Sequence, residues 1–517
     1  MLTLGDLTAK RAKLSGSREA LVFDDVRLTY AQLHDRSVRL ARALRARGLG
    51  SGDRLAVLAE NSHRFMELTF AAAHAGLVFV PLNFRLTKRE LAFMLEDSGA
   101  QALFADKACW EVALAVRDAG RAGRPLYAID QVDGAEATHE QLIEQGADER
   151  ALDVEVGEDD LAALIYTGGT TGLPKGVMLT HRNLLTSMAS ILLELRFTEH
   201  DTTLMVLPMF HVAVWQVLCH LMVGARVVVR ARADLADILA TIERERCTSM
   251  NAVPTLYNWI LAFPDLDRYD LSSMRRMMYG GSPFPEEVLR RCIQRFGPIF
   301  TQGYGLTEAA PGVSFLAAED HVVDGPRSRL LRSAGRELPL TEVRIGDAQG
   351  HEVARGEPGE VLVRGANVMK GYWNNEALTR ERLRDGWLRT GDVGTMDEEG
   401  YIFLLDRKAD MIVSGGENVY PSEVEAVLYE HPGVQECVVA SAPDEKWGER
   451  VQAAVVVRKG ATITEAELLD FCRERLAGYK CPKRIEFRET LPKSLVGKLL
   501  RKDVRGEFWG GAERQIR

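Results

Sequence analysis

Residues 166–176 read YTGGTTGLPKG, and the interpretation of the whole chain begins with this stretch. It holds four glycines, three threonines and one lysine in eleven positions. Glycine lets backbone N–H groups approach an anion closely, while hydroxyl and ammonium groups add donors and positive charge. The stretch therefore predicts a loop that binds phosphate. Its expected contacts are Thr167, Gly168, Gly169, Thr170, Thr171, Gly172 and Lys175.

The flanks of this loop indicate how it is held. LAALIYT (161–167) predicts a buried strand and VMLTHRNLLTSMASILLEL (177–195) leads into a helix, so we expect a strand–turn–helix unit. The loop is not the common P-loop, which needs glycine before its lysine and a hydroxyl residue after it. Here Pro174 precedes Lys175 and Gly176 follows it. On these residues alone, a plain surface loop between strand and helix stays open.

Length and composition restrict the class of protein. The chain has 517 residues, more than one hydrophobic core holds, and is 46% hydrophobic and 27% charged. A net charge of −9 does not favour a nucleic-acid surface. The seven cysteines are scattered and form no C-x-x-C pair, which argues against a zinc site or a disulfide framework and fits a reducing cytosol. The N-terminus carries charges within its apolar part, so no signal peptide is expected.

The most apolar stretch of the chain is FMELTFAAAHAGLVFVPL (65–82). It contains Glu67, His74 and Gly76, so a buried helix running into a buried strand explains it better than a membrane span. We therefore expect no transmembrane segment and a cytoplasmic location.

Helical and strand patterns alternate along the first part of the chain. Thr29 to Arg47 predicts an amphipathic helix, with Thr29 and Gln32 spaced as a capping box, and Arg54–Leu58 predicts a buried strand. Two further helix–strand pairs follow the same order, at 90–98 with 102–104 and at 235–246 with 249–252. This alternation predicts an α/β fold with largely parallel sheets.

The pattern changes after about residue 330. Short strands separated by glycine turns, at 342–347, 359–365 and 401–407, predict a small β-rich subdomain. Beyond Arg407 strands and helices mix again over a length typical of one small domain. We therefore predict two domains, 1–405 and 406–517, joined by a short hinge because no Pro/Ser-rich linker marks the boundary.

Four more segments accompany the glycine-rich loop. They read TQGYGLTEAAPG (301–312), WLRTGDVG (387–394), DRKADMIVSGGENVYPSEVE (406–425) and LPKSLVGKLLR (491–501). In this order and spacing, the five segments resemble the acyl-adenylate-forming superfamily, which includes acyl-CoA synthetases, adenylation domains of peptide synthetases and beetle luciferases. The resemblance covers nearly the whole chain. It implies a large N-terminal domain of two α/β subdomains and a small β-barrel-like subdomain, followed by a small mobile α+β domain.

The resemblance also implies a reaction in two steps. A carboxylate attacks the α-phosphate of ATP to give acyl-AMP and pyrophosphate, and a thiol then takes the acyl group while AMP leaves. The glycine-rich loop would hold the ATP phosphates, although Gly168 stands where the family usually has serine. We expect no loss of function from that departure, because the threonines and backbone amides are still present.

Family motifs assign roles to residues of the first step. Lys498 matches the adenylation lysine, Thr307 a phosphate contact and Glu308 the magnesium ligand. A carboxylate plus phosphate oxygens is a usual magnesium environment. The adenosine contacts implied by the same motifs are Gly281, Ser282, Pro283, Gln302, Gly303, Tyr304, Gly305, Asp392 and Arg407, with Tyr304 stacked on adenine and Asp392 and Arg407 at the ribose.

The implied second step uses a different face of the C-terminal domain, which rotates after adenylation. The residues expected to meet coenzyme A are Ser414, Gly415, Gly416, Glu417 and Trp447. The matching pivot position is Ala409, where the family has a charged residue, so the hinge residue itself stays open.

The acyl side is implied by LPMFHVAVW (207–215), in which His211 would be the gate beside the reacting carboxylate. The residues expected to line the acyl site are His211, Ala213, Trp215, Gly303 and Pro311. Amino-acid-activating relatives hold an aspartate at the His211 position, so its absence argues against α-amino acids. Small and apolar lining residues favour an uncharged acyl body.

The sequence therefore predicts an acid–thiol ligase that uses ATP, Mg²⁺ and CoA and acts on a medium- to long-chain fatty acid. Three alternatives stay open. They are a ligase for aryl or cyclic acids, an enzyme that loads a carrier protein, and a nucleotide-binding protein without activity. A homodimer also stays open, and no nucleic-acid partner is expected.

Overall fold

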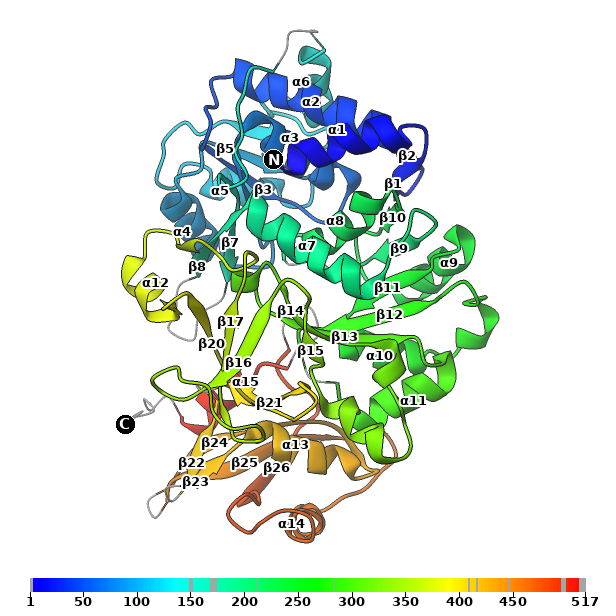
Figure 1. The fold of residues 1–517 in the computed structure, drawn as a ribbon, viewed down its shortest axis with the longest axis vertical. Helices are drawn as coiled ribbons and strands as arrows, with labels where there is room; N and C mark the ends of the chain where they lie inside the picture. Colours follow the sequence, from blue (N-terminus) through cyan, green and yellow to red (C-terminus); the bar gives the residue numbers. More distant parts are fainter. Residues whose placement is uncertain are drawn as a thin grey trace.

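The computed structural model describes residues 3–147, 152–167, 174–211, 213–282, 284–407, 410–414, 417–444, 447–493 and 499–510, with the backbone alone at 213–216 and 407. Figure 1 shows helices α1 to α3 at one end of the molecule. The last strands, together with α13 and α14, lie at the opposite end. In chain order the helices are α1 Leu4–Ser15, α2 Tyr30–Ala46, α3 His63–Ala75, α4 Lys88–Ser98, α5 Trp110–Val116, α6 His139–Gln145, α7 His181–Leu195, α8 Ala213–Val223, α9 Leu235–Glu245, α10 Pro254–Leu261, α11 Glu286–Phe296, α12 Glu376–Arg382, α13 Pro421–Glu430, α14 Glu465–Arg473 and α15 Arg501–Phe508.

Two large sheets form the N-terminal part. Among the described residues, one has seven strands and the other nine. Both have a parallel centre and antiparallel strands at an edge. The seven-stranded sheet runs β18 Gly371–Tyr372, β8 Lys175–Thr180, β7 Leu161–Thr167, β4 Val78–Leu82, β3 Arg54–Leu58, β5 Ala102–Ala105 and β6 Leu126–Ala128. The nine-stranded sheet runs β15 Arg336–Glu337, β14 Gly312–Leu316, β13 Phe300–Gly305, β12 Arg276–Gly280, β11 Ser249–Ala252, β9 Thr202–Met205, β10 Arg226–Val229, β1 Glu19–Phe23 and β2 Val26–Thr29.

The two large sheets share one hydrophobic core. Val57, Phe79 and Ile165 of the seven-stranded sheet belong to the same buried cluster as Val227 and Met278 of the nine-stranded sheet. Side chains of α2, α3, α7 and α8 fill the space between the sheets. Since parallel strands carry side chains on two buried faces, each sheet has a second core on its other side.

Two smaller sheets complete the fold among the described residues. An antiparallel sheet holds β16 Glu342–Gly346, β17 Gly359–Arg364, β20 Trp387–Met396 and β19 Leu383–Arg384, with β21 Ile402–Arg407 beside β20. The C-terminal sheet holds β23 Glu417–Val419, β22 Ile412–Ser414, β25 Gly448–Val457 and β24 Val434–Asp444, with β26 Arg484–Phe487 beside β25. The C-terminal sheet has its own buried cluster with α13 and α14.

The predicted fold class is confirmed. The capping box at Thr29 and Gln32 forms in both directions and starts α2. The apolar stretch 65–82 is helix α3 followed by strand β4, as expected. Its Glu67 is fully buried and accepts a hydrogen bond from Arg36. The boundary at residues 405 and 406 stays a prediction.

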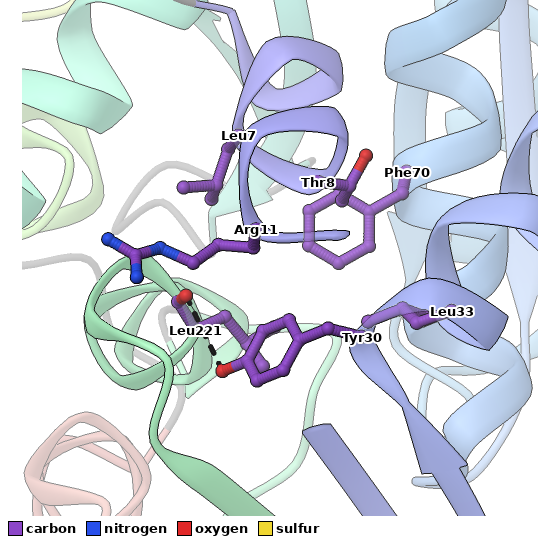
Figure 2. A pocket seen from close by; sticks show the side chains of 7 residues that line it. All are labelled: Leu7, Thr8, Arg11, Tyr30, Leu33, Phe70 and Leu221. Carbon is purple, nitrogen blue, oxygen red and sulfur yellow. Dashed lines mark hydrogen bonds between the residues drawn. The ribbon is translucent and has the colours of Figure 1, made fainter. Parts of the chain in front are cut away.

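A small cavity lies where α1, α2 and α3 pack against α8 (Figure 2). It is lined by Leu7, Thr8, Arg11, Tyr30, Leu33, Phe70 and Leu221. The Tyr30 hydroxyl donates to the Ala225 carbonyl at 2.5 Å, which fixes α2 against the end of α8. The cavity measures about 10 Å³, no more than one water molecule requires, so it is a packing defect and not an acyl pocket. Within the part of the chain that the structure describes, none of the helices is both long and apolar enough to cross a membrane.

Arg124 is a fully buried guanidinium that binds only backbone carbonyls. It donates to Ala100 at 2.8 Å and Ala119 at 2.8 Å, and also to the carbonyls of Leu95 and Arg117. These contacts join the end of α4 to the turn that follows α5.

Replacing Arg124 by leucine should destabilise the protein by at least about 3 kcal/mol, because buried carbonyls left without donors cost about 1–3 kcal/mol each. Urea unfolding followed by circular dichroism measures the change. Arg121→Leu is the matched control, since Arg121 is exposed in the same turn. Equal midpoints for the two variants would contradict this assignment.

Candidate active site

The glycine-rich loop joins two strands and not a strand and a helix, which corrects the expectation from its flanks. β7 and β8 pair antiparallel, with Thr167 opposite Lys175. Residues 175–180 form a strand because Val177 and Leu179 alternate into the core, and α7 begins only at His181. The signal for this boundary was present in the sequence, since Thr180 and Asn183 form a capping box. Gly168, Gly169, Thr170, Thr171 and Gly172 lie outside the described residues.

Asp97 of α4 fixes the base of this hairpin. Its carboxylate accepts a hydrogen bond of 2.6 Å from the Tyr166 hydroxyl, and its backbone carbonyl accepts from the Trp373 indole at 2.8 Å. Burial and the neighbouring Asp97 raise the pKa of Tyr166, so its hydroxyl stays a donor at neutral pH. The predicted phosphate contacts Thr167 and Lys175 therefore stand at the end of a strand pair that Asp97 holds in place.

Residues 366–373, called the bridging segment below, connect the hairpin to the turn that follows β13. On the hairpin side, Lys370 N–H donates to the Met178 carbonyl and Trp373 N–H to the Gly176 carbonyl. On the other side, Met369 N–H donates to the Glu308 carbonyl at 2.8 Å. The segment thus places the predicted magnesium ligand close to the strand that carries Lys175.

The carboxylate of Glu308 is held by a second residue of the bridging segment. The Tyr372 hydroxyl donates to Glu308 Oε1 at 2.8 Å. Burial and the Glu308 charge raise the pKa of Tyr372, so the hydroxyl keeps its proton and orients the carboxylate. Glu308 lies in a short 3₁₀ turn, Thr307–Ala309, which begins with the predicted phosphate contact Thr307.

The residues predicted at the adenosine also come together. The Tyr304 hydroxyl at the end of β13 donates to Asp392 Oδ2 of β20 at 2.7 Å. Asp392 in turn lies opposite Arg407 in the β20–β21 pairing, although the Arg407 side chain is outside the described part. Three segments far apart in the sequence therefore meet at one point, as the resemblance implies.

Glycines let the backbone approach closely around Tyr304. A Cβ at Gly305 would lie 1.7 Å from the Pro311 carbonyl oxygen, and one at Gly280 would lie 2.4 Å from that of Gly303. Gly303 has slightly more space, since the atom nearest its built Cβ is on the Phe315 ring at 3.0 Å. Gln302 pairs with Tyr279 in the neighbouring strand, and Gly281 and Ser282 follow that strand directly. Pro283 lies outside the described residues.

His211 belongs to an aromatic cluster at the junction of the two large sheets. Its ring lies 4.5 Å from that of Phe210, which meets Phe84 edge-on at 5.3 Å. Burial first, and the nearby Arg85 cation second, lower the pKa of His211 to about 4. His211 is therefore neutral at pH 7. Ala213 and Trp215 lie in the first turn of α8, but their side chains are not described.

The predicted coenzyme A face lies on the C-terminal sheet. Ser414 ends β22 and pairs with Gly448, next to the exposed Trp447, and Glu417 begins β23. Gly415, Gly416, the predicted pivot Ala409 and the predicted catalytic residue Lys498 lie outside the described residues.

Two groups of the C-terminal domain hold Asp406. Asp406 is the first residue after the predicted boundary, but it lies in β21, which pairs with β20 of the small antiparallel sheet. Arg501 Nη1 donates to Asp406 Oδ1 at 2.7 Å, and Ser422 N–H donates to Oδ2 at 3.0 Å. Arg501 also binds Glu425 at 2.8 Å, within its own domain. These contacts fix the observed orientation of the C-terminal domain.

The donor set at Glu308 fits magnesium. Within the described ranges, no three acidic, histidine or cysteine side chains gather as a metal site. Magnesium commonly uses one or two carboxylates with phosphate oxygens and waters, so it would arrive with the nucleotide at Glu308. The metal role of Glu308 stays a prediction.

The sequence interpretation missed Tyr372, Asp97 and Arg85. Tyr372 stands in the short run GYW (371–373), which the motif analysis passed over. Asp97 and Arg85 carry no local signal, because their role depends on contacts with residues far away in the chain.

Comparisons with known proteins cover nearly the whole chain. The model of the AMP-binding enzyme family matches residues 8–373, and that of the AMP-binding enzyme C-terminal domain matches 423–498. A feruloyl-CoA synthase of an Amycolatopsis species is 43% identical over 98% of this chain and 99% of the relative. The long-chain-fatty-acid–CoA ligase FadD13 of Mycobacterium tuberculosis is 37% identical over 98% and 99%. The solved o-succinylbenzoate CoA synthetase MenE of Bacillus subtilis, in complex with its acyl-adenylate intermediate, has a TM-score of 0.84 at 34% identity, covering 96% of this chain and 97% of that one.

Replacing Tyr372 by phenylalanine should raise the KM for ATP about threefold to tenfold, because loss of one hydrogen bond of about 1 kcal/mol frees the Glu308 carboxylate. Steady-state kinetics at fixed magnesium measures this effect. Tyr401→Phe is the matched control, because the Tyr401 hydroxyl donates to Asp320 at 2.9 Å outside the candidate site. The same change in both variants, or in neither, would contradict the role given to Tyr372.

Proposed function

Because the chain belongs to the AMP-binding enzyme family, as its sequence predicts, we propose that it joins an aryl-substituted acrylic acid of the feruloyl type to coenzyme A. The chain is an AMP-forming acid–CoA ligase, that is, an acid–thiol ligase, and this part of the sequence prediction is confirmed. The acid is the proposed part.

The similarity to feruloyl-CoA synthase carries the proposed substrate class. That relative is 43% identical over 98% of this chain. The aromatic rings of Phe84, Phe210 and His211 support it, because they offer faces and edges against which an aryl group packs.

A fatty acid, which we expected from the sequence, is the second candidate. The long-chain ligase at 37% identity favours it. The side chains of Ala213 and Trp215, which would decide between a long tunnel and a short pocket, lie outside the described part.

The first step brings the acid carboxylate to the α-phosphate of ATP, one anion against another. Lys175 and Lys498 would offset that repulsion, and Thr167 would donate to a phosphate oxygen. Magnesium, held through Glu308, would supply further positive charge to the phosphates. Asp392 would accept hydrogen bonds from the ribose hydroxyls. His211 is neutral and would add no charge; its contribution would be shape and a hydrogen bond beside the carboxylate.

The second step transfers the acyl group from acyl-AMP to the thiol of coenzyme A. Rotation of the C-terminal domain would need to break the contacts of Arg501 and Ser422 with Asp406 and bring the β22–β23 hairpin to the site. A cytoplasmic location, a homodimer and the hinge at Ala409 are further proposals.

Product analysis by mass spectrometry tests the function. With ATP, magnesium and coenzyme A, kcat/KM for ferulate should exceed that for dodecanoate and hexadecanoate by about tenfold or more, a difference of about 1.4 kcal/mol at the transition state. Benzoate, succinylbenzoate and amino acids complete the panel.

The control is Lys498→Ala, which should form no acyl-CoA from free acid. A preference for the fatty acids would move the assignment to the second candidate. Formation of acyl-AMP without any acyl-CoA would contradict coenzyme A as the acceptor and favour a carrier protein.

A further inference from the structure

Arg85 lies beside the candidate gate but belongs to none of the predicted motifs. It follows β4 in the loop that leads to α4, on the seven-stranded sheet. Its guanidinium carbon lies 5.2 Å from the Phe84 ring centre and 5.8 Å from the Phe210 ring centre. Phe210 and His211 come from the nine-stranded sheet, so Arg85 reaches across the junction between the two sheets.

The guanidinium of Arg85 has no direct ion-pair partner among the described residues. Its Nη1 is buried and makes no hydrogen bond. Glu60 is near enough to affect the pKa of Arg85, but its carboxylate pairs with Arg232 at 2.9 Å. Burial lowers the pKa of Arg85, yet a guanidinium remains protonated at neutral pH.

Arg85 is partly buried, and a buried N–H group without an acceptor costs stability unless a ligand completes its contacts. Arg85 is also the charged group beside His211, which is neutral at pH 7. The two phenylalanine rings hold the guanidinium by cation–π contact and leave its N–H groups free to donate. A planar guanidinium in that setting suits the paired oxygens of a carboxylate or a phosphate.

We propose that Arg85 is a substrate-binding residue whose guanidinium receives anionic oxygens that enter beside His211. Both substrates that would pass this junction carry such oxygens: the acid through its carboxylate and coenzyme A through its phosphates. The proposal rests on the proposed function only in taking these two molecules as substrates, and it does not depend on which acid is used.

Arg85→Gln removes the charge and Arg85→Lys keeps it without the planar fork. Arg89→Gln is the matched control, because Arg89 is exposed at the start of α4. Three quantities are measured for each variant: the KM for the acid in pyrophosphate exchange without coenzyme A, the KM for coenzyme A in the full reaction, and the KM for ATP. The acid is ferulate, or whichever acid of the panel the unmodified enzyme uses best.

The expected result is a rise of about tenfold in one KM for Arg85→Gln, a smaller rise for Arg85→Lys and none for Arg89→Gln. A rise in the exchange assay identifies the carboxylate as the ligand, and a rise confined to the full reaction identifies coenzyme A. A change in the KM for ATP alone, or unchanged KM values for both acid and coenzyme A, would overturn the proposal.

Melting temperatures separate binding from a structural role without using activity. Arg85→Gln should melt at or above the temperature of the unmodified protein, because it removes a partly buried charge that has no direct ion-pair partner. The shift in melting temperature on adding ferulate or coenzyme A as probe should shrink for the same substrate whose KM rises. A lower melting temperature with undiminished probe shifts would show that Arg85 only holds the two sheets together. Failure of the feruloyl assignment would appear separately, in the unmodified enzyme's acid panel.

Discussion

The bridging segment at residues 366–373 is the constraint on which the candidate site depends. It is hydrogen-bonded to β8, which begins with Lys175, and to the turn that carries Glu308. The groups expected to bind phosphate and magnesium come from different sheets, and among the described strands no pairing joins those two sheets. A shared hydrophobic core aligns the two sheets, while the hydrogen bonds from Tyr372 and Met369 position Glu308.

The site also shows how charge is distributed between neighbouring groups. His211 is the residue that the family motif singles out, yet burial keeps it neutral. The cation beside it is Arg85, which the motif does not include. The two carboxylates of the site, Asp392 and Glu308, each accept a hydrogen bond from a tyrosine hydroxyl. This bond orients the carboxylate, and it brings no opposite charge next to it. A site for three anionic substrates could thus keep acidic residues at the positions where we propose that they bind sugar hydroxyls or a metal.

Much of the fold could be predicted because it depends on local patterns. The Thr29–Gln32 capping box, the buried strand Arg54–Leu58 and the mixed C-terminal domain all follow from spacing and hydrophobicity. The strand at 175–180 was missed because its alternation is short and merges into the helix that follows. Motifs could place Tyr304 and Asp392 in one site, and the structure brings them into contact. Asp97, Tyr372 and Arg85 could not be found, because their contacts join residues whose proximity only the tertiary fold creates.

We propose that this site forms a bond between a carboxylate oxygen and the α-phosphate of ATP before any thiol reacts. Oxygen-isotope transfer is the measurement that tests this order of steps. The acid is labelled with ¹⁸O in its carboxylate, turned over with ATP, magnesium and coenzyme A, and the AMP is analysed by mass spectrometry. We expect one labelled oxygen in AMP, because the bond from that oxygen to phosphorus survives when the thiol takes the acyl group. Unlabelled AMP, or label in inorganic phosphate with release of ADP, would contradict it.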